Sequence, residues 1–504
     1  MTTFRRQTIQ RVGLAGGPVL ALVVYLLLPE RYTGIAGEPV AFATAGRATL
    51  AVMAWMATWW LTEAIDIAAT ALLPIAVFPV VGILPIGRAT APYGSDLIFL
   101  FMGGFILALS MQRWGLDRRI ALFTLRIVGS KPASIIGGFM LVTAGLSMWV
   151  SNTATAAMML PIALSVVSLA GGPTENTDST PRDANFALSL MLGIAYAASI
   201  GGIATIIGSP PNGILVQFVE LQYGREISFA EWMLIGGPVT LVFLPLAWVL
   251  ITWVLYPIRL RSLEGGQELF ESEFRKLGPL KRGESVTMVV FFCTALLWIT
   301  RPLLAKLTFG PGDGWHPFAG LSDAGIAILA AMALFVIPGA PRTFTMNWQT
   351  AAKLPWGILI LFGGGLSLAA AVQSNGVAEF LGAQATSLRD MPAIVLVLAV
   401  TTGVIFLTEL TSNTATTATM VPILAGLAPG LGLGPEMLII PATIAASCAF
   451  MMPVATPPNA IVFGSGLITI PQMAWAGFWL NIIGVAIVTL TLYAIVLPLL
   501  GTLP

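Results

Sequence analysis

The sequence predicts an all-α membrane protein that crosses the bilayer many times and is built as an inverted repeat. Of its 504 residues, 57% are hydrophobic and 9% are charged, whereas about 25% of the residues of a soluble domain are charged. The segment Ser151–Thr155 (S-N-T-A-T) recurs 261 positions further on as Ser412–Thr416, inside equally apolar sequence. A duplicated membrane chain that repeats an uncharged polar cluster predicts one central site shared by its two halves.

The offset of 261 extends without gaps beyond the motif. It pairs Phe101, Gly103, Gly104, Leu107, Ala108, Gln112 and Gly115 with Phe362, Gly364, Gly365, Leu368, Ala369, Gln373 and Gly376. The net charge of +1 suggests no nucleic-acid partner. The two cysteines, Cys293 and Cys448, lie in apolar runs and predict neither a disulfide nor a metal site.

About 20 apolar residues cross a bilayer as a helix, and this length divides the chain into eleven predicted spans. They lie at approximately 13–29, 41–61, 64–86, 94–112, 186–222, 230–256, 284–304, 323–338, 355–374, 436–470 and 474–500. The first is predicted to be a retained span, because no Ala-x-Ala cleavage site follows it.

Two further apolar pairs flank the repeated motifs, 133–150 with 154–170 and 392–411 with 415–428. Each pair is either two ordinary spans or a re-entrant hairpin with the Ser-Asn-Thr cluster at its tip. The turns carry no charge and have apolar neighbours, which favours hairpins, because a polar turn at membrane depth is tolerated where protein buries it.

The Lys and Arg residues predict the orientation in the membrane. Most of them fall on one side of the predicted spans when the N-terminus is cytoplasmic, which places the C-terminus outside. Span 94–112 and its repeat 355–374 then run in opposite directions, and one hairpin enters from each side. The charged segment 257–283 is predicted to be a cytoplasmic linker that contains an interfacial helix.

A second motif follows each hairpin, first as Gly208–Asn212 (G-S-P-P-N) and then as Ala455–Asn459 (A-T-P-P-N). Two adjacent prolines are expected to break a spanning helix, because proline lacks an N–H and clashes with the preceding turn. The break frees carbonyl groups on the incoming half and N–H groups on the outgoing half. Carbonyl groups suit a bare cation such as Na⁺, and helix N-termini suit carboxylate or sulfate, so the pattern predicts a secondary transporter.

The stretch Ser447–Ala460 (S-C-A-F-M-M-P-V-A-T-P-P-N-A), the paired tips and Trp59–Ala64 (W-W-L-T-E-A) together resemble the divalent anion:sodium symporter family. The resemblance covers nearly the whole chain. It implies sodium-coupled uptake of a di- or tricarboxylate or of sulfate, a homodimer, and an elevator-like motion of a transport domain against a scaffold. One departure is Asp66, where the family pattern leads us to expect proline.

The resemblance also divides the chain. Scaffold helices occupy 1–93 and 230–354, with the linker 257–283 inside the second segment, and the C-terminal helix occupies 474–504. The first transport repeat is 94–229, with its hairpin at 133–170 and broken helix at 186–222. The second is 355–473, with its hairpin at 392–428 and broken helix at 436–470.

Carried over residue by residue, the resemblance implies two sodium sites and one substrate site between them. The sodium residues are Ser147, Ser151, Asn152 and Gly208 in the first half and Thr408, Thr411, Asn413 and Ala455 in the second. The substrate residues are Asn152, Thr153, Ser209, Pro210, Asn413, Thr414, Thr456 and Pro457. Independently of the resemblance, hydroxyl, amide and freed carbonyl oxygens are the uncharged ligands that Na⁺ requires, although most membrane Ser and Thr residues serve helix packing.

Two acids, Glu63 and Glu409, lie in apolar sequence, where a charge costs on the order of +3 kcal/mol. We expect both to lie outside the direct ligand set. The favoured function is coupling of inward Na⁺ movement to uptake of a divalent anion, most simply a C4-dicarboxylate such as succinate, in the inner (plasma) membrane. The alternatives are a sodium-independent exchanger of the same fold and a proton-coupled anion transporter, and no enzyme motif is present.

Overall fold

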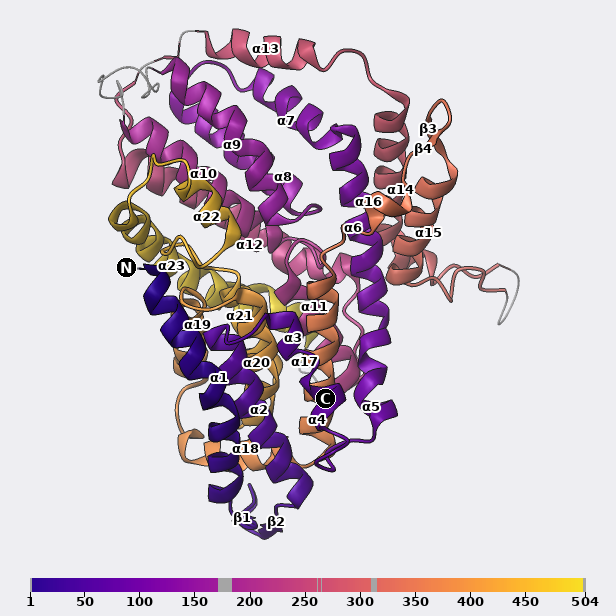
Figure 1. Ribbon diagram of the computed structural model, residues 1–504, viewed down its shortest axis with the longest axis vertical. Helices are drawn as coiled ribbons and strands as arrows, with labels where there is room; N and C mark the ends of the chain where they lie inside the picture. The colour runs from indigo at the N-terminus through magenta and orange to yellow at the C-terminus, as the bar shows by residue number, and fades with distance from the viewer. Residues whose placement is uncertain (1, 171–183, 261, 264, 310–314, 502–504) are drawn as a thin grey trace.

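The computed structural model describes residues 2–170, 184–260, 262–263, 265–309 and 315–501, with side chains from residue 8 onward. The regular structure is almost entirely helical (Figure 1). The elements as far as the linker are α1 (Thr2–Leu27), β1 (Arg31–Thr33), β2 (Pro39–Ala41), α2 (Thr44–Thr62), α3 (Ile67–Thr70), α4 (Leu73–Val77), α5 (Ile86–Thr90), η1 (Ala91–Gly94), α6 (Asp96–Trp114), α7 (Leu116–Ile127), α8 (Pro132–Ser147), α9 (Asn152–Leu169), α10 (Ala184–Gly202), α11 (Pro210–Tyr223), α12 (Phe229–Val249) and η2 (Leu250–Leu255).

The remaining elements begin in the charged linker. They are α13 (Gly266–Lys276), α14 (Arg282–Leu304), α15 (Asp323–Val336), β3 (Pro338–Ala340), β4 (Thr343–Phe344), α16 (Trp348–Ala351), α17 (Trp356–Ser374), α18 (Val377–Ala385), η3 (Thr386–Leu388), α19 (Ala393–Thr408), α20 (Asn413–Leu427), α21 (Glu436–Ala446), α22 (Pro457–Phe463), α23 (Ile470–Thr491), η4 (Leu492–Val496) and α24 (Leu497–Leu500). The strands form two antiparallel hairpins, β1–β2 and β3–β4.

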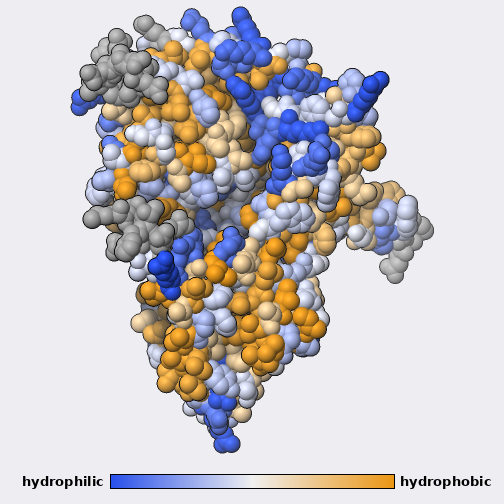
Figure 2. All heavy atoms as spheres, in the orientation of Figure 1, coloured by the Kyte–Doolittle hydropathy of each residue, from blue (hydrophilic) through white to orange (hydrophobic). Residues whose placement is uncertain are grey.

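The helices confirm the prediction of a polytopic membrane protein. Among the described residues, eight helices are long and apolar enough to span a membrane, or nine if the bent pair Val377–Leu388 and Ala393–Thr408 counts as one span. Apolar side chains cover much of the face in Figure 2, and hydrophilic ones gather at the top of the view and at its lower tip. The bilayer takes the place of water for the apolar side chains on this surface.

The prediction of one continuous span at 64–86 is wrong. This segment contains only the short helices α3 and α4, followed by a turn. Asp66 begins α3 by accepting a hydrogen bond from the Ala68 N–H at 2.8 Å, as an N-cap residue does. Pro74 and Pro79 and the positive φ of Gly82 (73°) then prevent a long regular helix.

The predicted breaks and hairpins have clear counterparts. Segment 186–222 divides into α10 and α11, and segment 436–470 divides into α21 and α22. The incoming hairpin arms, α8 and α19, have 16 residues each. At 1.5 Å per residue such an arm is about 24 Å long, shorter than the hydrocarbon core of about 30 Å, as a hairpin arm would be. The outgoing arm α9 has 18 residues and is one of the eight helices counted above, so the choice between hairpins and ordinary spans stays a prediction.

Matching helix bounds make the duplication visible in the structure. Helices α7, α8 and α9 begin at residues 116, 132 and 152, and α18, α19 and α20 begin 261 positions later at 377, 393 and 413. Gly115 and Gly376 precede α7 and α18 with φ of 73° and 72°, a left-handed conformation that glycine adopts without strain. The match extends to α12 and α23, since a short π-helical segment follows each of them.

The two halves are interlocked around a buried centre. Helix α10 is buried along nearly its whole length. Helix α11, which leaves the first break, packs against α17, α20 and α21, and α22, which leaves the second break, packs against α9 and α10. Figure 1 shows α22 beside α10 in the upper part of the molecule and α11 beside α17 near the middle. Each outgoing half-helix therefore contacts the other half of the chain.

The predicted helix in the charged linker is present as α13. Figure 1 shows it lying across the top of the molecule, next to α7. Its Glu271 and Glu273 carboxylates are paired with Arg126 and Arg118 of α7 at 2.6 and 2.9 Å. The hydrogen bond from Lys276 lowers the pKa of Glu273. The two ion pairs connect α13 to α7, which precedes the first hairpin.

Candidate functional site

Both hairpin tips turn between a helix C-terminus and a helix N-terminus. In the first hairpin α8 ends at Ser147 and α9 begins at Asn152, and the Ser151 Oγ accepts a hydrogen bond from the Ala154 N–H at 3.3 Å. In the second, α19 ends at Thr408 and α20 begins at Asn413. The uncharged polar residues of each motif thus lie at the start of a helix, where N–H groups are unpaired.

The two Pro-Pro-Asn motifs organise the breaks in the same way. The Asn212 Nδ2 donates to the carbonyl oxygens of Gly202 at 2.9 Å and Thr205 at 2.8 Å. In the second half the Asn459 Nδ2 donates to the carbonyl oxygens of Ala449 at 3.1 Å and Met452 at 3.0 Å. The asparagines supply a donor to the Gly202 and Ala449 carbonyls at the ends of the broken helices and a second donor to the Thr205 and Met452 carbonyls, which also accept from the N–H groups of Gly208 and Ala455. This accounts for asparagine after the two prolines that begin α11 and α22.

Four oxygen-bearing groups come together between the first tip and the first break. The Ser147 Oγ lies 2.7 Å from the Ala198 carbonyl oxygen and 2.5 Å from the end of the Asn152 side chain. The same end atom of Asn152 lies 3.2 Å from the carbonyl oxygens of Ala198 and Gly208. We call Ser147, Asn152, Ala198 and Gly208 the first oxygen cluster.

The orientation of the Asn152 amide determines what the first cluster can hold. Hydrogen bonding within the protein favours Nδ2 in the shared position, from which the amide donates to Ser147, Ala198 and Gly208. If Oδ1 occupies it, four oxygens face one another, and a cation among them offsets their mutual repulsion. Sodium has the right chemistry, because hydroxyl, amide and main-chain oxygens supply ligands without adding a fixed charge.

The second half repeats this geometry. The Thr408 Oγ1 lies 2.7 Å from the Asn413 Oδ1 and 3.0 Å from the Ala446 carbonyl oxygen. Thr408 and Asn413 occupy the positions of Ser147 and Asn152 in the repeat. We call Thr408, Asn413 and Ala446 the second oxygen cluster. The sequence pointed to the broken helices but not to Ala198 and Ala446, because a main-chain carbonyl is the same in every residue.

The remaining sodium candidates have other contacts. The Ser151 hydroxyl caps α9, and the Thr411 hydroxyl bonds to the Leu407 carbonyl oxygen at 2.9 Å and to the Thr416 hydroxyl at 2.7 Å. Ala455 is buried in the turn before α22, where its N–H donates to the Met452 carbonyl oxygen at 3.1 Å. Within the described part of the chain, none of these three residues forms a hydrogen bond to its cluster.

The substrate candidates lie at the N-caps or in the first turns of α9, α11, α20 and α22. Thr153 and Pro457 are exposed, whereas Thr414 and Pro210 are partly buried. The Thr456 Oγ1 caps α22 by accepting a hydrogen bond from the Asn459 N–H at 3.3 Å.

A contact between two serines joins the two halves at this point. The Ser209 hydroxyl, at the start of α11, lies 3.4 Å from the Ser447 hydroxyl, at the end of α21. Both serines are buried. The first break therefore touches the second, and the tips and breaks form one connected region.

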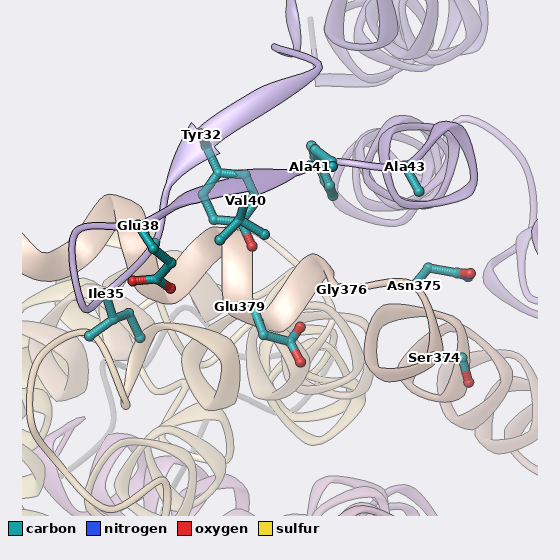
Figure 3. A pocket seen from close by; sticks show the side chains of 12 residues that line it. Tyr32, Ile35, Glu38, Val40, Ala41, Ala43, Ser374, Asn375, Gly376 and Glu379 are labelled. Atoms are coloured by element: carbon teal, nitrogen blue, oxygen red, sulfur yellow. The ribbon is translucent and has the colours of Figure 1, made fainter.

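The cavity in Figure 3 lies elsewhere. It has a volume of about 520 Å³ and is lined by the turn between α17 and α18 and by the β1–β2 hairpin, with Tyr32, Glu38, Asn375 and Glu379 among its residues. None of the predicted site residues lines it. Burial and the nearby Glu379 and Glu38 carboxylates raise the pKa of Tyr32.

The two membrane acids have different surroundings. Glu63 follows α2 with a left-handed backbone (φ 47°). The Glu409 carboxylate is buried and bonded to backbone N–H groups of the second break. In the described part of the chain, no group of three or more His, Cys, Asp or Glu side chains could hold a metal ion, and both cysteines are free thiols.

Comparison with known proteins places these features in a family. Residues 19–501 match the model of the sodium:sulfate symporter transmembrane region. The sodium-dependent dicarboxylate transporter SdcS of Staphylococcus saprophyticus is 42% identical over 496 residues, which cover 98% of this chain and 92% of that protein. SdcS of Staphylococcus aureus is 43% identical over 495 residues, with coverage of 98% and 92%.

Two solved structures share the fold at low sequence identity. The YdaH transporter of Alcanivorax borkumensis aligns with a TM-score of 0.60 at 15% identity and covers 97% of this chain and 98% of its own. MtrF of Neisseria gonorrhoeae, described as an antimetabolite efflux pump, aligns with a TM-score of 0.59 at 15% identity and covers 98% and 96%. At this identity the likeness concerns the fold alone.

Proposed function

Because this chain belongs to the sodium:sulfate symporter family, we propose that it couples inward sodium movement to the uptake of a divalent anion. A C4-dicarboxylate such as succinate is the proposed substrate, in keeping with the dicarboxylate transport named for the relatives that are 42–43% identical. The observation that carries the proposal is the pair of oxygen clusters, one at Ser147 and Asn152 and its repeat at Thr408 and Asn413.

The sodium ions are cargo in this scheme, and each oxygen cluster holds one of them. The described ligands are uncharged, so each bound ion brings a net positive charge into the centre of the protein. Coulomb interactions are strong in a medium of low dielectric constant, so two bound cations create a favourable place for a doubly charged anion. Without the cations the same oxygens repel a dicarboxylate, and this difference couples the two movements.

The anion would bind between the tips, against Asn152, Thr153, Asn413 and Thr414. Helices α9, α20, α11 and α22 all begin in this region, and their N-terminal N–H groups favour negative charge. Ser209 with Pro210 and Thr456 with Pro457 would close the site from the two breaks. These helix starts take the place of the lysine or arginine that an anion site otherwise requires.

The movement that exposes this site alternately to the two sides would be elevator-like. The moving unit would contain the repeats 94–229 and 355–473, and their inverted orientation would let one hairpin reach the centre from each side of the membrane. Helices α12 and α23 pack against this unit, on α8 and α10 and on α19 and α21 respectively. A homodimeric scaffold would hold it in the inner membrane, with the N-terminus cytoplasmic and the C-terminus outside.

Uptake of labelled succinate into proteoliposomes tests the proposal. An inward sodium gradient should drive accumulation above equilibrium, and replacing sodium by potassium at equal ionic strength should abolish it. Equal uptake in the two salts would contradict sodium coupling and favour the sodium-independent exchanger. Uptake driven by a pH gradient in potassium would favour the proton-coupled alternative.

A further inference from the structure

Glu409 lies beside the second oxygen cluster and has no acidic counterpart in the first half. It directly follows Thr408, whose hydroxyl belongs to the second cluster. At the matching position of the first half, 261 residues earlier, the sequence has Met148. The Glu409 residue is 3% exposed. A buried acid on one side of an otherwise symmetric pair of sites requires a physical reason.

The contacts of Glu409 provide that reason. Its Oε1 accepts hydrogen bonds from the N–H groups of Phe450 at 2.7 Å and Met451 at 2.9 Å. Its Oε2 accepts from the N–H groups of Met451 at 3.0 Å and Met452 at 3.2 Å. These three residues form part of the unwound segment between α21 and α22, which lacks helical hydrogen bonds of its own.

A fourth donor completes the set. The Asn481 Nδ2, from the buried interior of α23, donates to the Glu409 Oε1 at 2.8 Å. Among the described residues, every hydrogen-bond partner of the Glu409 carboxyl group is an N–H donor, so the group acts only as an acceptor, as a carboxylate does. One side chain thus joins the second hairpin tip, the second break and α23.

The first half makes the equivalent connection with neutral groups. The Thr205 Oγ1 donates to the Met148 carbonyl oxygen at 2.5 Å and accepts from the Gly208 N–H at 3.0 Å. Thr205 corresponds to Met452, and Met148 corresponds to Glu409, so both connections join the same two places in the repeat. The link between tip and break is a hydroxyl bond in one half and a carboxylate in the other.

We propose that Glu409 is a positioning residue that makes the two cation sites unequal and gives the second oxygen cluster the higher sodium affinity. It would do so in two ways: by holding the unwound segment that follows Ala446 in place, and by adding a negative charge next to Thr408 and Asn413. The attraction between a carboxylate and a cation is long-ranged in a medium of low dielectric constant, so direct coordination is unnecessary. This inference rests on the proposed function of the clusters as sodium sites.

The test compares purified, full-length parent protein with Glu409→Gln, Glu409→Asp and, as a matched control, Glu63→Gln. The control makes the same change at the other acid in apolar sequence, which lies at the end of α2. Two quantities are measured against sodium concentration at constant ionic strength, with potassium as the replacement. They are the initial rate of succinate uptake into proteoliposomes and the unfolding temperature in detergent.

We expect Glu409→Gln to raise the sodium concentration for half-maximal uptake at least about fivefold, with a smaller loss of maximal rate. The sodium-dependent rise in unfolding temperature should shift to higher sodium by a similar factor. Glu409→Asp keeps the charge, so its sodium concentration for half-maximal uptake should lie between the values for Glu409→Gln and the parent. The value for Glu63→Gln should equal that of the parent. If Glu409→Gln does not yield folded protein, the test uses Glu409→Asp, for which we expect a higher sodium concentration for half-maximal uptake than in the parent.

A purely structural role gives a different result. An unchanged sodium midpoint in Glu409→Gln with a lower maximal rate and a lower unfolding temperature would overturn the inference, as would an unchanged midpoint in Glu409→Asp. Failure of the proposed function is distinguishable, since the parent protein itself would then show the same uptake and the same unfolding temperature in sodium and in potassium.

Discussion

Replacing Thr408 by valine removes one oxygen from the second cluster with almost no change of side-chain shape. The Thr408 Oγ1 lies 2.7 Å from the Asn413 Oδ1 and 3.0 Å from the Ala446 carbonyl oxygen, and the side chain is fully buried. A methyl group in this place can neither coordinate sodium nor donate the one hydrogen bond that the hydroxyl gives to one or other of these oxygens. The substitution therefore tests directly whether this hydroxyl is a cation ligand.

Two opposing effects determine the magnitude. The lost ligand should weaken sodium binding by about 2–3 kcal/mol, the scale of a hydrogen bond to a charged group. The site without sodium also loses stability, by about 1 kcal/mol, because the single hydroxyl hydrogen that either the Asn413 Oδ1 or the Ala446 carbonyl oxygen accepts is lost, while sodium would satisfy both oxygens. The difference is about 1–2 kcal/mol, and since 1.4 kcal/mol is a factor of ten, we expect an approximately tenfold higher sodium concentration for half-maximal uptake.

A second threonine on the same helix provides the matched control. Thr401 is also fully buried in α19, and within the described part of the chain its hydroxyl has no hydrogen-bond partner. Thr401→Val should keep the parental sodium dependence and an equal or higher unfolding temperature, because it removes an unsatisfied buried hydroxyl.

Succinate uptake by reconstituted protein across a sodium titration measures both Thr408→Val and Thr401→Val. A sodium midpoint for Thr408→Val within about twofold of the parent would refute the reasoning, since that is well below the tenfold shift expected from 1.4 kcal/mol. An equally large shift of the sodium midpoint in Thr401→Val would also refute the reasoning, because loss of any hydroxyl from α19 would then be enough to weaken the sodium dependence.

Two further predictions concern the break and its packing. Asn212→Ala leaves the Gly202 carbonyl without its donor and the Thr205 carbonyl with only the 3.3 Å hydrogen bond from the Gly208 N–H, which should cost about 1–3 kcal/mol, lower the unfolding temperature and reduce uptake; unchanged thermal unfolding would contradict the capping role. Gly201→Ala would place a Cβ 2.4 Å from the Ala144 carbonyl oxygen, whereas a Cβ at Gly145 meets nothing within 4 Å. Expression and size-exclusion profiles should therefore show loss of folded protein for the first glycine variant only, and two equal profiles would argue against close packing of α8 on α10.

The repeat and its polar motifs made much of the candidate site predictable. The offset between Ser151 and Ser412 located both tips, and the paired prolines located both breaks. Ser147 and Thr408 then followed from the symmetry and the family resemblance, and the structure brings each next to an asparagine of its tip. Side-chain chemistry that is repeated at a fixed distance can be recognised in the sequence alone.

Main-chain geometry could not be predicted in this way. The carbonyls of Ala198 and Ala446 join the clusters only because each helix ends where it does. The Thr411 hydroxyl instead bonds to the Leu407 carbonyl one turn earlier, a local contact that competes with ligand binding and is available to any helical threonine. The partners of Glu409 are likewise backbone N–H groups, which no residue type reveals.

The extent of the spans was also only partly predictable. Hydropathy placed the long helices α12, α14 and α17 well, because their apolar stretches are continuous. It failed at 64–86, where the composition is apolar but Asp66, Pro74 and Pro79 interrupt the helix. Average hydropathy over a window does not register where a helix is capped or broken.

The most direct test of the paired oxygen clusters is an experimental structure of the protein in lipid nanodiscs, determined with sodium and succinate and again with potassium alone. The account predicts, in sodium, one cation peak among Ser147, Asn152, Ala198 and Gly208, a second beside Thr408, Asn413 and Ala446, and succinate between the two tips. Both cation peaks should be missing in potassium. Succinate bound away from the tips, or both clusters without cations at saturating sodium, would contradict it.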